Sequence, residues 1–283
     1  MTDVRMPALR ISDALGRPLE LERPPRRIIS LVPSITEALF AFGLEASVAG
    51  VTRFCTEPED GVAGKPRVGG TKDPDMERII GLEPDLVVAN AEENRREDIE
   101  RLAAAGIAVF VTYPRTVRQA IGMMRDLARI TAAGDAARPL IQQAETELVR
   151  AAQANRSRRP LRVFCPIWRP WMTIGPDTYI HDFIAACGGA NVFATSPERY
   201  PTTGLDEVAR LAPEVILLPD EPYPFSAKHV PELMAWREVP AVRNERIYLV
   251  EGKQLCWYGP RIAGSLRAMQ GLLWGEAGTQ PHL

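Results

Sequence analysis

The chain has 283 residues, of which 46% are hydrophobic and 25% charged, with a formal net charge of −2. This composition is typical of a globular protein with room for two hydrophobic cores, and it excludes a disordered or fibrous chain. The near-neutral charge disfavours nucleic acid as a partner. No apolar run approaches the roughly 18 residues that a membrane-spanning helix needs.

The first half of the chain predicts a hairpin followed by alternating strands and helices. The hairpin lies in residues 8–25, with its turn near Leu15 to Pro18. Ser34 and Glu37 predict a capping box at the start of the first helix, and the Gly- and Pro-rich segment 53–74 predicts a loop. The predicted strands are 27–33, 47–52, 85–90 and 107–112. The predicted helices are 34–43, 75–82, 92–105 and 116–131.

The segment 134–157 predicts one long amphipathic helix. Pro139 lies in its first turn, where a missing N–H is tolerated, and arginines follow its end. About 22 residues at 1.5 Å each span roughly 33 Å, the width of a domain. The apolar positions recur at helical spacing and are Ala137, Leu140, Ile141, Ala144, Leu148, Ala151 and Ala152.

The order of elements starts again after this helix. The predicted strands are 161–167, 214–219 and 246–250, and the predicted helices are 179–187, 205–211, 231–237 and 260–274. Glu77 precedes Pro84, and Asp206 precedes Pro213, by the same spacing. We therefore predict an α/β fold of two similar lobes, each a mainly parallel sheet flanked by helices. The lobes would be 1–134 and 158–283, joined by a backbone helix at 135–157, with a ligand cleft between them.

Loops after parallel strands are the expected ligand-binding positions. Aromatic residues concentrate there in the second half, which suits a large, flat, partly apolar ligand, although each ring could instead anchor its loop to the core. The candidate ligand residues from these loops are Arg53, Phe54, Cys55, Trp168, Arg169, Trp171, Tyr200, Trp257 and Tyr258.

Signatures of catalysis or of a bound metal are weak. The sequence lacks a nucleophile elbow, a phosphate-binding P-loop and a dinucleotide fingerprint, and its three histidines are scattered. We expect no enzyme activity, no intrinsic cofactor and no bound metal. Cys55, Cys165 and Cys256 each fall near the end of a strand, so they could form a thiolate site or be small buried residues.

These motifs resemble the substrate-binding proteins of ABC importers for cobalamin and iron chelates, the group with a rigid helical backbone. The resemblance covers nearly the whole chain, and its segments occur in the family's order. They are RRIISLVPSITEALFAFG, GVTRFC, DMERIIGLEPDLVVAN, ACGGANVFA, LDEVARLAPEVILL and WYGPRI. The resemblance implies a periplasmic or cell-envelope protein that acts as a monomer with a membrane permease. Residues 1–27 show no secretory signal, so a cytoplasmic location is expected if residue 1 is the true start.

The resemblance also implies roles for individual residues. Acidic residues on each lobe of the family dock into basic pockets of the permease, and they match Glu77 and Asp206, with Glu207 adjacent. Read alone, these acids also suit helix starts. In the cobalamin-binding member, aromatic residues of both lobes sandwich the corrin, and they match Phe54 and Tyr200.

The sequence departs from that member at Thr71, where the family pattern has a tryptophan, and in the additional cluster IWRPW at 167–171. The ligand therefore stays open between cobalamin, another corrinoid, haem and a ferric chelate. Arg53, Lys72 and Arg169 would suit acidic ligand edges. The alternatives are a cytoplasmic metal-handling protein or enzyme that uses the cysteines, and a partner-docking module without a ligand.

Overall fold

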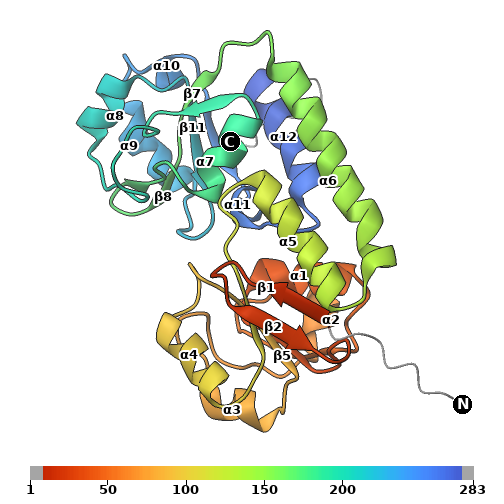
Figure 1. Cartoon of the computed structure of the whole chain (residues 1–283). Helices are drawn as coiled ribbons and strands as arrows, with labels where there is room; N and C mark the ends of the chain where they lie inside the picture. The colour runs from red at the N-terminus through yellow and green to blue at the C-terminus, as the bar shows by residue number, and fades with distance from the viewer. Residues whose placement is uncertain (1–8, 276–283) are drawn as a thin grey trace, which may run out of the picture. The chain divides into compact units, whose positions relative to one another are not determined.

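The computed structural model describes residues 9–275, which form two compact units (Figure 1). Unit 1 comprises the residues up to Pro114 together with 120–142 and 258–260, and unit 2 comprises 115–119, 143–257 and the residues from Arg261 onward. Residues 1–8 and 276–283, which the predicted lobes include, lie outside the described residues. Each unit is an α/β fold with its own sheet.

Unit 1 is built on a parallel sheet of four strands in the order β4-β3-β5-β6. The strands are β3 (Ile28–Ser30), β4 (Val48–Val51), β5 (Leu86–Asn90) and β6 (Val109–Thr112). All residues of β3 and β5 are buried, as the continuous apolar runs predicted. The predicted hairpin is confirmed as the antiparallel pair β1 (Leu9–Ser12) and β2 (Pro18–Leu21).

Helices connect these strands. They are α1 (Pro33–Ala41), α2 (Glu59–Ala63), α3 (Met76–Gly81), α4 (Arg96–Ala104) and α5 (Val117–Ile130). The Asp75 side chain accepts a hydrogen bond from the Arg78 N–H and caps α3, where the sequence predicted a helix start.

Unit 2 repeats the plan with a parallel sheet in the order β10-β7-β11-β12. Its strands are β7 (Leu161–Phe164), β10 (Gly189–Asn191), β11 (Val215–Pro219) and β12 (Ile247–Val250). A small antiparallel pair, β8 (Pro166–Trp168) and β9 (Met172–Thr173), follows the first strand. The helical elements are α7 (Tyr179–Ala186), α8 (Leu205–Leu211), the 3-10 turn η1 (Ala227–His229), α9 (Val230–Met234), α10 (Pro240–Arg243), α11 (Gly252–Cys256) and α12 (Ile262–Trp274).

The two sheets share one topology. When the strands of each parallel sheet are numbered in chain order, the second lies beside the first, the first beside the third, and the third beside the fourth. The predicted α/β class with two similar lobes and parallel sheets is confirmed.

The similarity extends to the residues that precede the third strand. Asp85 accepts hydrogen bonds from the backbone N–H groups of Arg26 and Arg27 at 2.8 and 2.9 Å. In unit 2, Glu214 accepts one from the N–H of Arg162 at 3.0 Å. Each carboxylate therefore fixes the chain at the start of the first strand against the start of the third.

The arginine that enters the first strand also has a matching role. The Arg27 Nε donates to the carbonyl of Leu82 at 3.0 Å, and the Arg162 Nε donates to the carbonyl of Ala212 at 2.9 Å. The residues before the two prolines, Glu83 and Ala212, have positive φ values of 46° and 43°. The repeat first indicated by the spacing of two prolines thus recurs in backbone conformation and hydrogen bonding.

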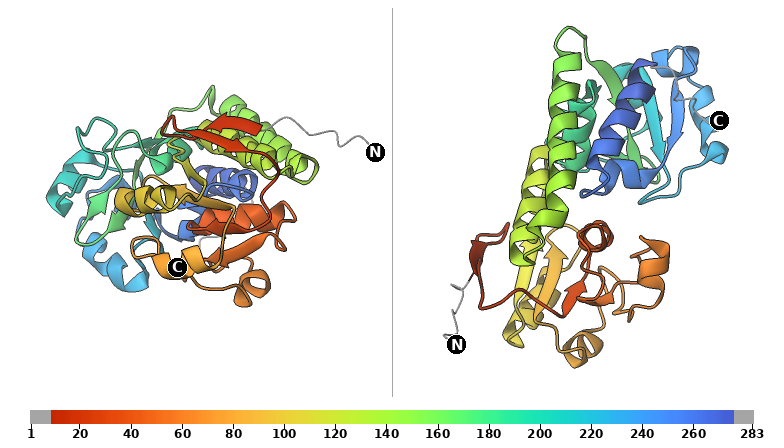
Figure 2. Two further views of the ribbon diagram at one scale, coloured as in Figure 1. Left: turned by 60° about the horizontal axis from the view of Figure 1, so that its bottom comes forward. Right: turned by 90° about the vertical axis from the view of Figure 1, so that its right-hand side faces the viewer.

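The predicted long helix is confirmed as α6 (Gly134–Asn155), drawn as the long green helix in Figure 2. Its residues up to Gln142 belong to unit 1 and the rest to unit 2. A buried stripe at heptad spacing consists of Ala137, Ile141, Ala144 and Ala151, with Leu148 partly buried. Ala152, which the periodicity assigned to this stripe, is exposed. Within unit 2, the Glu147 carboxylate of α6 pairs with Arg267 of α12 at 2.7 Å.

Several local predictions were wrong. Ser34 does not cap α1, because Pro33 occupies the first helical position and Val32 is the cap residue, while the Ser34 Oγ is buried and has no hydrogen-bond partner in the described part of the chain. The predicted loop 53–74 contains helix α2. The predicted helix at 92–105 begins only at Arg96. The predicted strand 161–167 is divided between β7 and β8, and the short elements β9, β10, η1, α10 and α11 were not predicted. Between residues 9 and 275, no helix is both long and apolar enough to cross a membrane.

The hydrogen bonds of the Glu214 carboxylate lead to a prediction about stability and pH. Hydrogen bonds from the Arg159 guanidinium lower the pKa of Glu214 from 4.5 to about 2. Because the pKa is lower in the folded protein, this stabilisation is complete above about pH 4.5 and is lost as the pH falls through about 2. We expect Glu214→Gln to lower the free energy of unfolding by about 1 kcal/mol at pH 7, with the deficit shrinking below pH 4.5. Urea unfolding of both proteins between about pH 2 and pH 7 measures this difference in the free energy of unfolding.

A suitable control is Asp135→Asn, which removes an exposed i,i+3 ion pair with Arg138 in α6. We expect that change to cost less than about 0.5 kcal/mol. Equal effects of the two substitutions would contradict a special role for Glu214.

Candidate functional site

The shared topology defines one switch point in each unit. The first and third strands are neighbours, and the connections that leave them run toward opposite edges of the sheet. Ligands of open parallel sheets bind beyond the carboxyl ends of such a strand pair. In unit 1 these strands are β3 and β5, and in unit 2 they are β7 and β11. The loops that follow them are therefore the first place to look for a ligand.

A buried polar network occupies the end of β5 in unit 1. The Asn90 Nδ2 donates to the Tyr258 hydroxyl at 2.7 Å, and that hydroxyl donates to the Glu93 carboxylate at 2.9 Å. The Asn94 side chain accepts a hydrogen bond from the backbone N–H of Asn90 and donates one to the carbonyl of Thr71 at 3.0 Å. Tyr258 is only 7% exposed. It therefore fixes the switch-point loop of unit 1 from within, and its ring offers little surface to a ligand.

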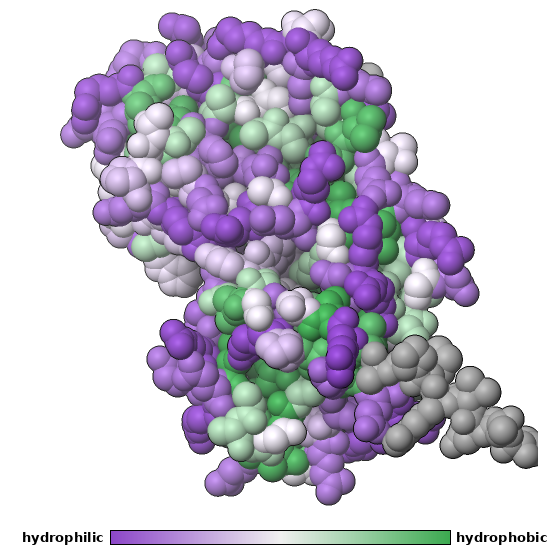
Figure 3. Space-filling view, viewed as in Figure 1, coloured by the Kyte–Doolittle hydropathy of each residue, from purple (hydrophilic) through white to green (hydrophobic). Residues whose placement is uncertain are grey.

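Exposed aromatic surface is scarce in both units. Six large hydrophobic side chains are exposed in the described part of the chain, and only two of them are aromatic, Phe54 at 50% in unit 1 and Trp168 at 48% in unit 2. Figure 3 shows the hydropathy of one face, where apolar residues are more frequent on unit 1 than on unit 2. One exposed ring per unit is the feature that best fits a flat ligand.

Phe54 lies in the loop after β4 beside charged residues. The Arg53 guanidinium lies over its ring, 4.9 Å from the centroid, and also pairs with the Asp73 carboxylate at 2.8 Å. Lys72 is exposed, and its Nζ donates to the carbonyl of Glu92 at 2.7 Å. Thr71 is half-buried.

Trp168 ends strand β8 in unit 2. Its ring meets Tyr223 edge-on, with centroids 5.8 Å apart. The next residue, Arg169, donates to the Glu232 carboxylate at 2.9 Å and lies over the ring of Trp171. Trp171 is 6% exposed and stacks on Phe225 with centroids 6.0 Å apart. Trp171 therefore anchors the β8–β9 hairpin in the core of unit 2, and Trp168 stays accessible.

The other aromatic candidates of unit 2 are more enclosed. Trp257 is 7% exposed, and its Nε1 donates to Glu221 at 3.1 Å. Burial raises the pKa of Glu221, which follows the end of β11, while Lys253 and the hydrogen bond from Trp257 act in the opposite direction. Tyr200 is half-buried, with the Arg199 guanidinium over its ring at 5.3 Å.

The acidic candidates for permease docking lie in the first turns of two equivalent helices. Glu77 is exposed on α3, and Asp206 and Glu207 are exposed on α8. The Thr203 hydroxyl donates to the Glu207 carboxylate at 2.7 Å. Glu207 thus acts at the helix start, which singles out Asp206 as the counterpart of Glu77.

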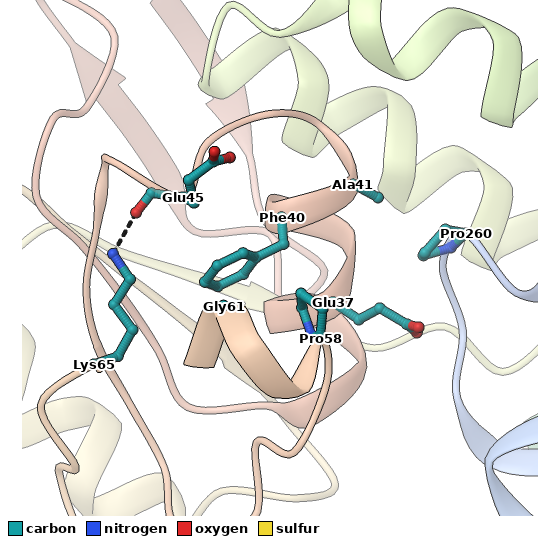
Figure 4. Close-up of a pocket in the computed structure, with 8 residues that line it drawn as sticks. All are labelled: Glu37, Phe40, Ala41, Glu45, Pro58, Gly61, Lys65 and Pro260. Atoms are coloured by element: carbon teal, nitrogen blue, oxygen red, sulfur yellow. Dashed lines mark hydrogen bonds between the residues drawn. The ribbon is translucent and has the colours of Figure 1, made fainter. Parts of the chain in front are cut away.

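A further groove in unit 1 was not anticipated from the sequence. It has a volume of about 610 Å³ and lies between α1 and α2 (Figure 4). Phe40 is central to it, and Gly61 gives this ring room, because a Cβ at Gly61 would lie 2.6 Å from a ring carbon. Its lining residues are Glu37, Phe40, Ala41, Glu45, Pro58, Gly61, Lys65 and Pro260. None of the predicted ligand residues lines this groove.

Comparison with known proteins shows which family this chain belongs to. Residues 28–253 match the family model described as periplasmic binding protein. The chain belongs to the periplasmic binding protein family. Proteins of this kind bind substrates for transport and are not an enzyme family. The matched segment includes all the predicted ligand and docking residues except Trp257 and Tyr258.

Relatives within the family agree with this placement. The vitamin B12-binding protein of Vibrio parahaemolyticus serotype O3:K6 is 25% identical over 250 residues, which cover 86% of this chain and 87% of the relative. The periplasmic vitamin B12 binding protein BtuF of Vibrio cholerae has a similar structure, with a TM-score of 0.79, 23% identity and coverage of 90% and 99% of the two chains. The periplasmic heme-binding protein RhuT of Roseiflexus sp. RS-1, in its apo form, gives a TM-score of 0.77 at 24% identity, with 88% and 98% covered. Both structural likenesses show a shared fold.

Of the cysteines that the sequence placed near strand ends, Cys55 belongs to unit 1, and Cys165 and Cys256 belong to unit 2. Cys55 is buried in unit 1, where its Sγ lies 3.1 Å from the hydroxyls of both Thr36 and Thr52. Cys165 is fully buried in unit 2, and Cys256 is half-buried and donates to the carbonyl of Gly252. Across residues 9–275, no group of three or more His, Cys, Asp or Glu side chains is arranged to hold a metal. Cys55 and Cys165 are therefore small buried core residues, which was the other interpretation of these cysteines.

This placement predicts how the thiols react. Burial raises the pKa of Cys165 to about 12 and also raises those of Cys55 and Cys187. At pH 8 only about one Cys165 in 10,000 would be a thiolate, so we expect iodoacetamide to leave these three cysteines unmodified in the folded protein. Cys256 should be the most reactive of the four. Mass spectrometry before and after urea unfolding measures the difference, and rapid labelling of Cys55 or Cys165 in the folded state would contradict it.

Proposed function

We propose that this protein is the substrate-binding component of an ABC importer and that it captures a corrinoid such as cobalamin, or a metal chelate of similar size. The family supports the transport role. The B12-binding relatives and the heme-binding structure of the same fold support a large planar macrocycle as the ligand. We also propose that the protein is located in the cell envelope and acts as a monomer.

The observation that carries the ligand class is the pair of exposed rings. Phe54 and Trp168 are the only exposed aromatic side chains among the large hydrophobic residues of the described chain, and each unit has one. Leaving about half of such a ring in water is unfavourable, and covering it with a flat ligand would recover that free energy. Tyr200, Thr71 and Lys72 are further proposed contacts. The buried Cys55, Trp171, Trp257 and Tyr258 would support these loops from behind.

Substitution of the two rings tests this function. We expect Phe54→Ala and Trp168→Ala each to weaken binding of cyanocobalamin, or of hemin if that is the ligand, by about 2- to 12-fold, because each would remove one stacking contact. Isothermal titration calorimetry is the suitable measurement, since Trp168 is itself a fluorophore. Leu15→Ala, a change at an exposed apolar residue of the hairpin turn, should leave affinity unchanged. If cyanocobalamin, hemin and a ferric siderophore all fail to bind the unmodified protein, the proposed function is wrong.

We also propose that Glu77 and Asp206 dock the protein onto its permease. Both are exposed, both occupy the first turn of the helix before the third strand, and the two helices are equivalent in the repeat. A carboxylate presented in this way from each unit would suit two equivalent basic pockets on a membrane partner.

Charge removal separates docking from ligand binding. We expect the double substitution Glu77→Gln and Asp206→Asn to lower ligand uptake by cells about tenfold or more, because it would remove both charged contacts, while calorimetry shows an unchanged affinity for the ligand. Glu207→Gln serves as the matched control, since that carboxylate already accepts the Thr203 hydroxyl. Normal uptake by the double variant would overturn the docking assignment.

A further inference from the structure

The exposed ring of each unit is adjacent in sequence to an arginine that is already paired with a carboxylate of the same unit. Arg53 precedes Phe54 and pairs with Asp73, and Arg169 follows Trp168 and pairs with Glu232. The two pairs join different elements and share no sequence pattern. Their common effect is that neither arginine presents an unbalanced positive charge.

The pair in unit 1 has a specific loop built around it. One nitrogen of Arg53, Nη2, lies 2.8 and 2.9 Å from the two carboxylate oxygens of Asp73. Gly70 makes this possible, because a Cβ at Gly70 would lie 2.2 Å from Asp73 Oδ1 and 2.7 Å from Arg53 Nη2. The backbone reinforces the arrangement, since the Arg53 N–H donates to the carbonyl of Gly69 and the Gly70 N–H donates to that of Asp73.

The pair in unit 2 is held from two sides. The Arg169 Nη1 donates to Glu232 at 2.9 Å, and the guanidinium also lies 4.6 Å from the centroid of the buried Trp171 ring. Turning Arg169 toward a ligand would break both contacts.

Charges of both signs lie beside the other candidate residues. Arg199 lies over the ring of Tyr200, and Lys253 and Arg261 lie over that of Trp257. Lys72 is exposed and cationic beside the Arg53–Asp73 pair. Each unit also has an acid after its third strand. Glu93 accepts a hydrogen bond from the Tyr258 hydroxyl in unit 1, and Glu221 accepts one from the Trp257 indole in unit 2. A ligand with free carboxylates would have to compete with Asp73 and Glu232 for the arginines, whereas one with amide edges would not.

We propose that the Arg53–Asp73 and Arg169–Glu232 pairs select against ligands with free carboxylates, so that the protein prefers an amide-edged corrinoid to a dicarboxylate porphyrin. This inference rests on the proposed function and narrows its ligand class. Both ion pairs are solvent-exposed, and exposed pairs contribute little, so each should account for a modest factor in selectivity.

Three substitutions test the inference with cyanocobalamin and hemin as probes. Asp73→Asn and Glu232→Gln each free one arginine, and we expect each to tighten hemin binding by about 2- to 5-fold while cyanocobalamin affinity stays within about 1.5-fold. Gly70→Ala should act in the same direction as Asp73→Asn, since the added Cβ displaces the ends of two flexible side chains and leaves the net charge unchanged.

Asp135→Asn is the control for charge alone, because it frees Arg138 in α6, a helix that carries neither exposed ring. Circular dichroism melts establish that each variant is folded. The inference is supported if Asp73→Asn, Gly70→Ala and Glu232→Gln tighten hemin binding and Asp135→Asn does not. It is overturned, with the proposed function intact, if the unmodified protein binds hemin more tightly than cyanocobalamin and the variants change neither affinity. Failure of cyanocobalamin, hemin and a ferric siderophore to bind would overturn the proposed function itself.

Discussion

A carboxylate that precedes the third strand holds the backbone at the start of the first strand in both units. Asp85 does this through two N–H groups of unit 1, and Glu214 does it in unit 2 with added support from Arg159. Fixing the first strand against the third fixes the switch point of a parallel sheet, where the connections diverge. The loops after these strands, which carry Glu93 in unit 1 and Trp168 in unit 2, are positioned by that arrangement.

Packing divides residues of the same type into supporting and accessible groups. Trp171 and Trp257 are buried, with Trp171 stacked on Phe225 and Trp257 donating to Glu221, whereas Trp168 keeps about half of its surface exposed. The buried rings keep their loops in place, and the exposed one has surface left to offer. A rigid support behind an accessible ring lowers the ordering cost of binding a flat ligand.

The charges beside the rings change how their arginines should be interpreted. From the sequence, Arg53 and Arg169 suited acidic ligand edges, but the fold supplies each with a carboxylate partner of its own. An arginine so paired acts as a neutral neighbour of the ring unless a stronger competitor displaces its partner. On the proposed function, the ligand choice of this protein would depend on Asp73 and Glu232 even if neither contacts the ligand.

The sequence by itself determined the α/β class, the alternation of strands and helices, the long helix α6 and the internal repeat. These follow from local periodicity and from Gly and Pro positions, which short-range sterics enforce. The family resemblance, carried by motifs such as GVTRFC, is also a property of the sequence, and the family match confirms it.

Which of the candidate residues are accessible depends on tertiary contacts. Cys55 follows Phe54 directly and Trp171 lies three residues after Trp168, yet both are buried, as is Tyr258. Burial and pairing depend on contacts between distant segments, such as Asn90 with Tyr258 or Arg169 with Glu232. No local pattern encodes these contacts, because the partners meet only after the sheets have formed and brought the loops together.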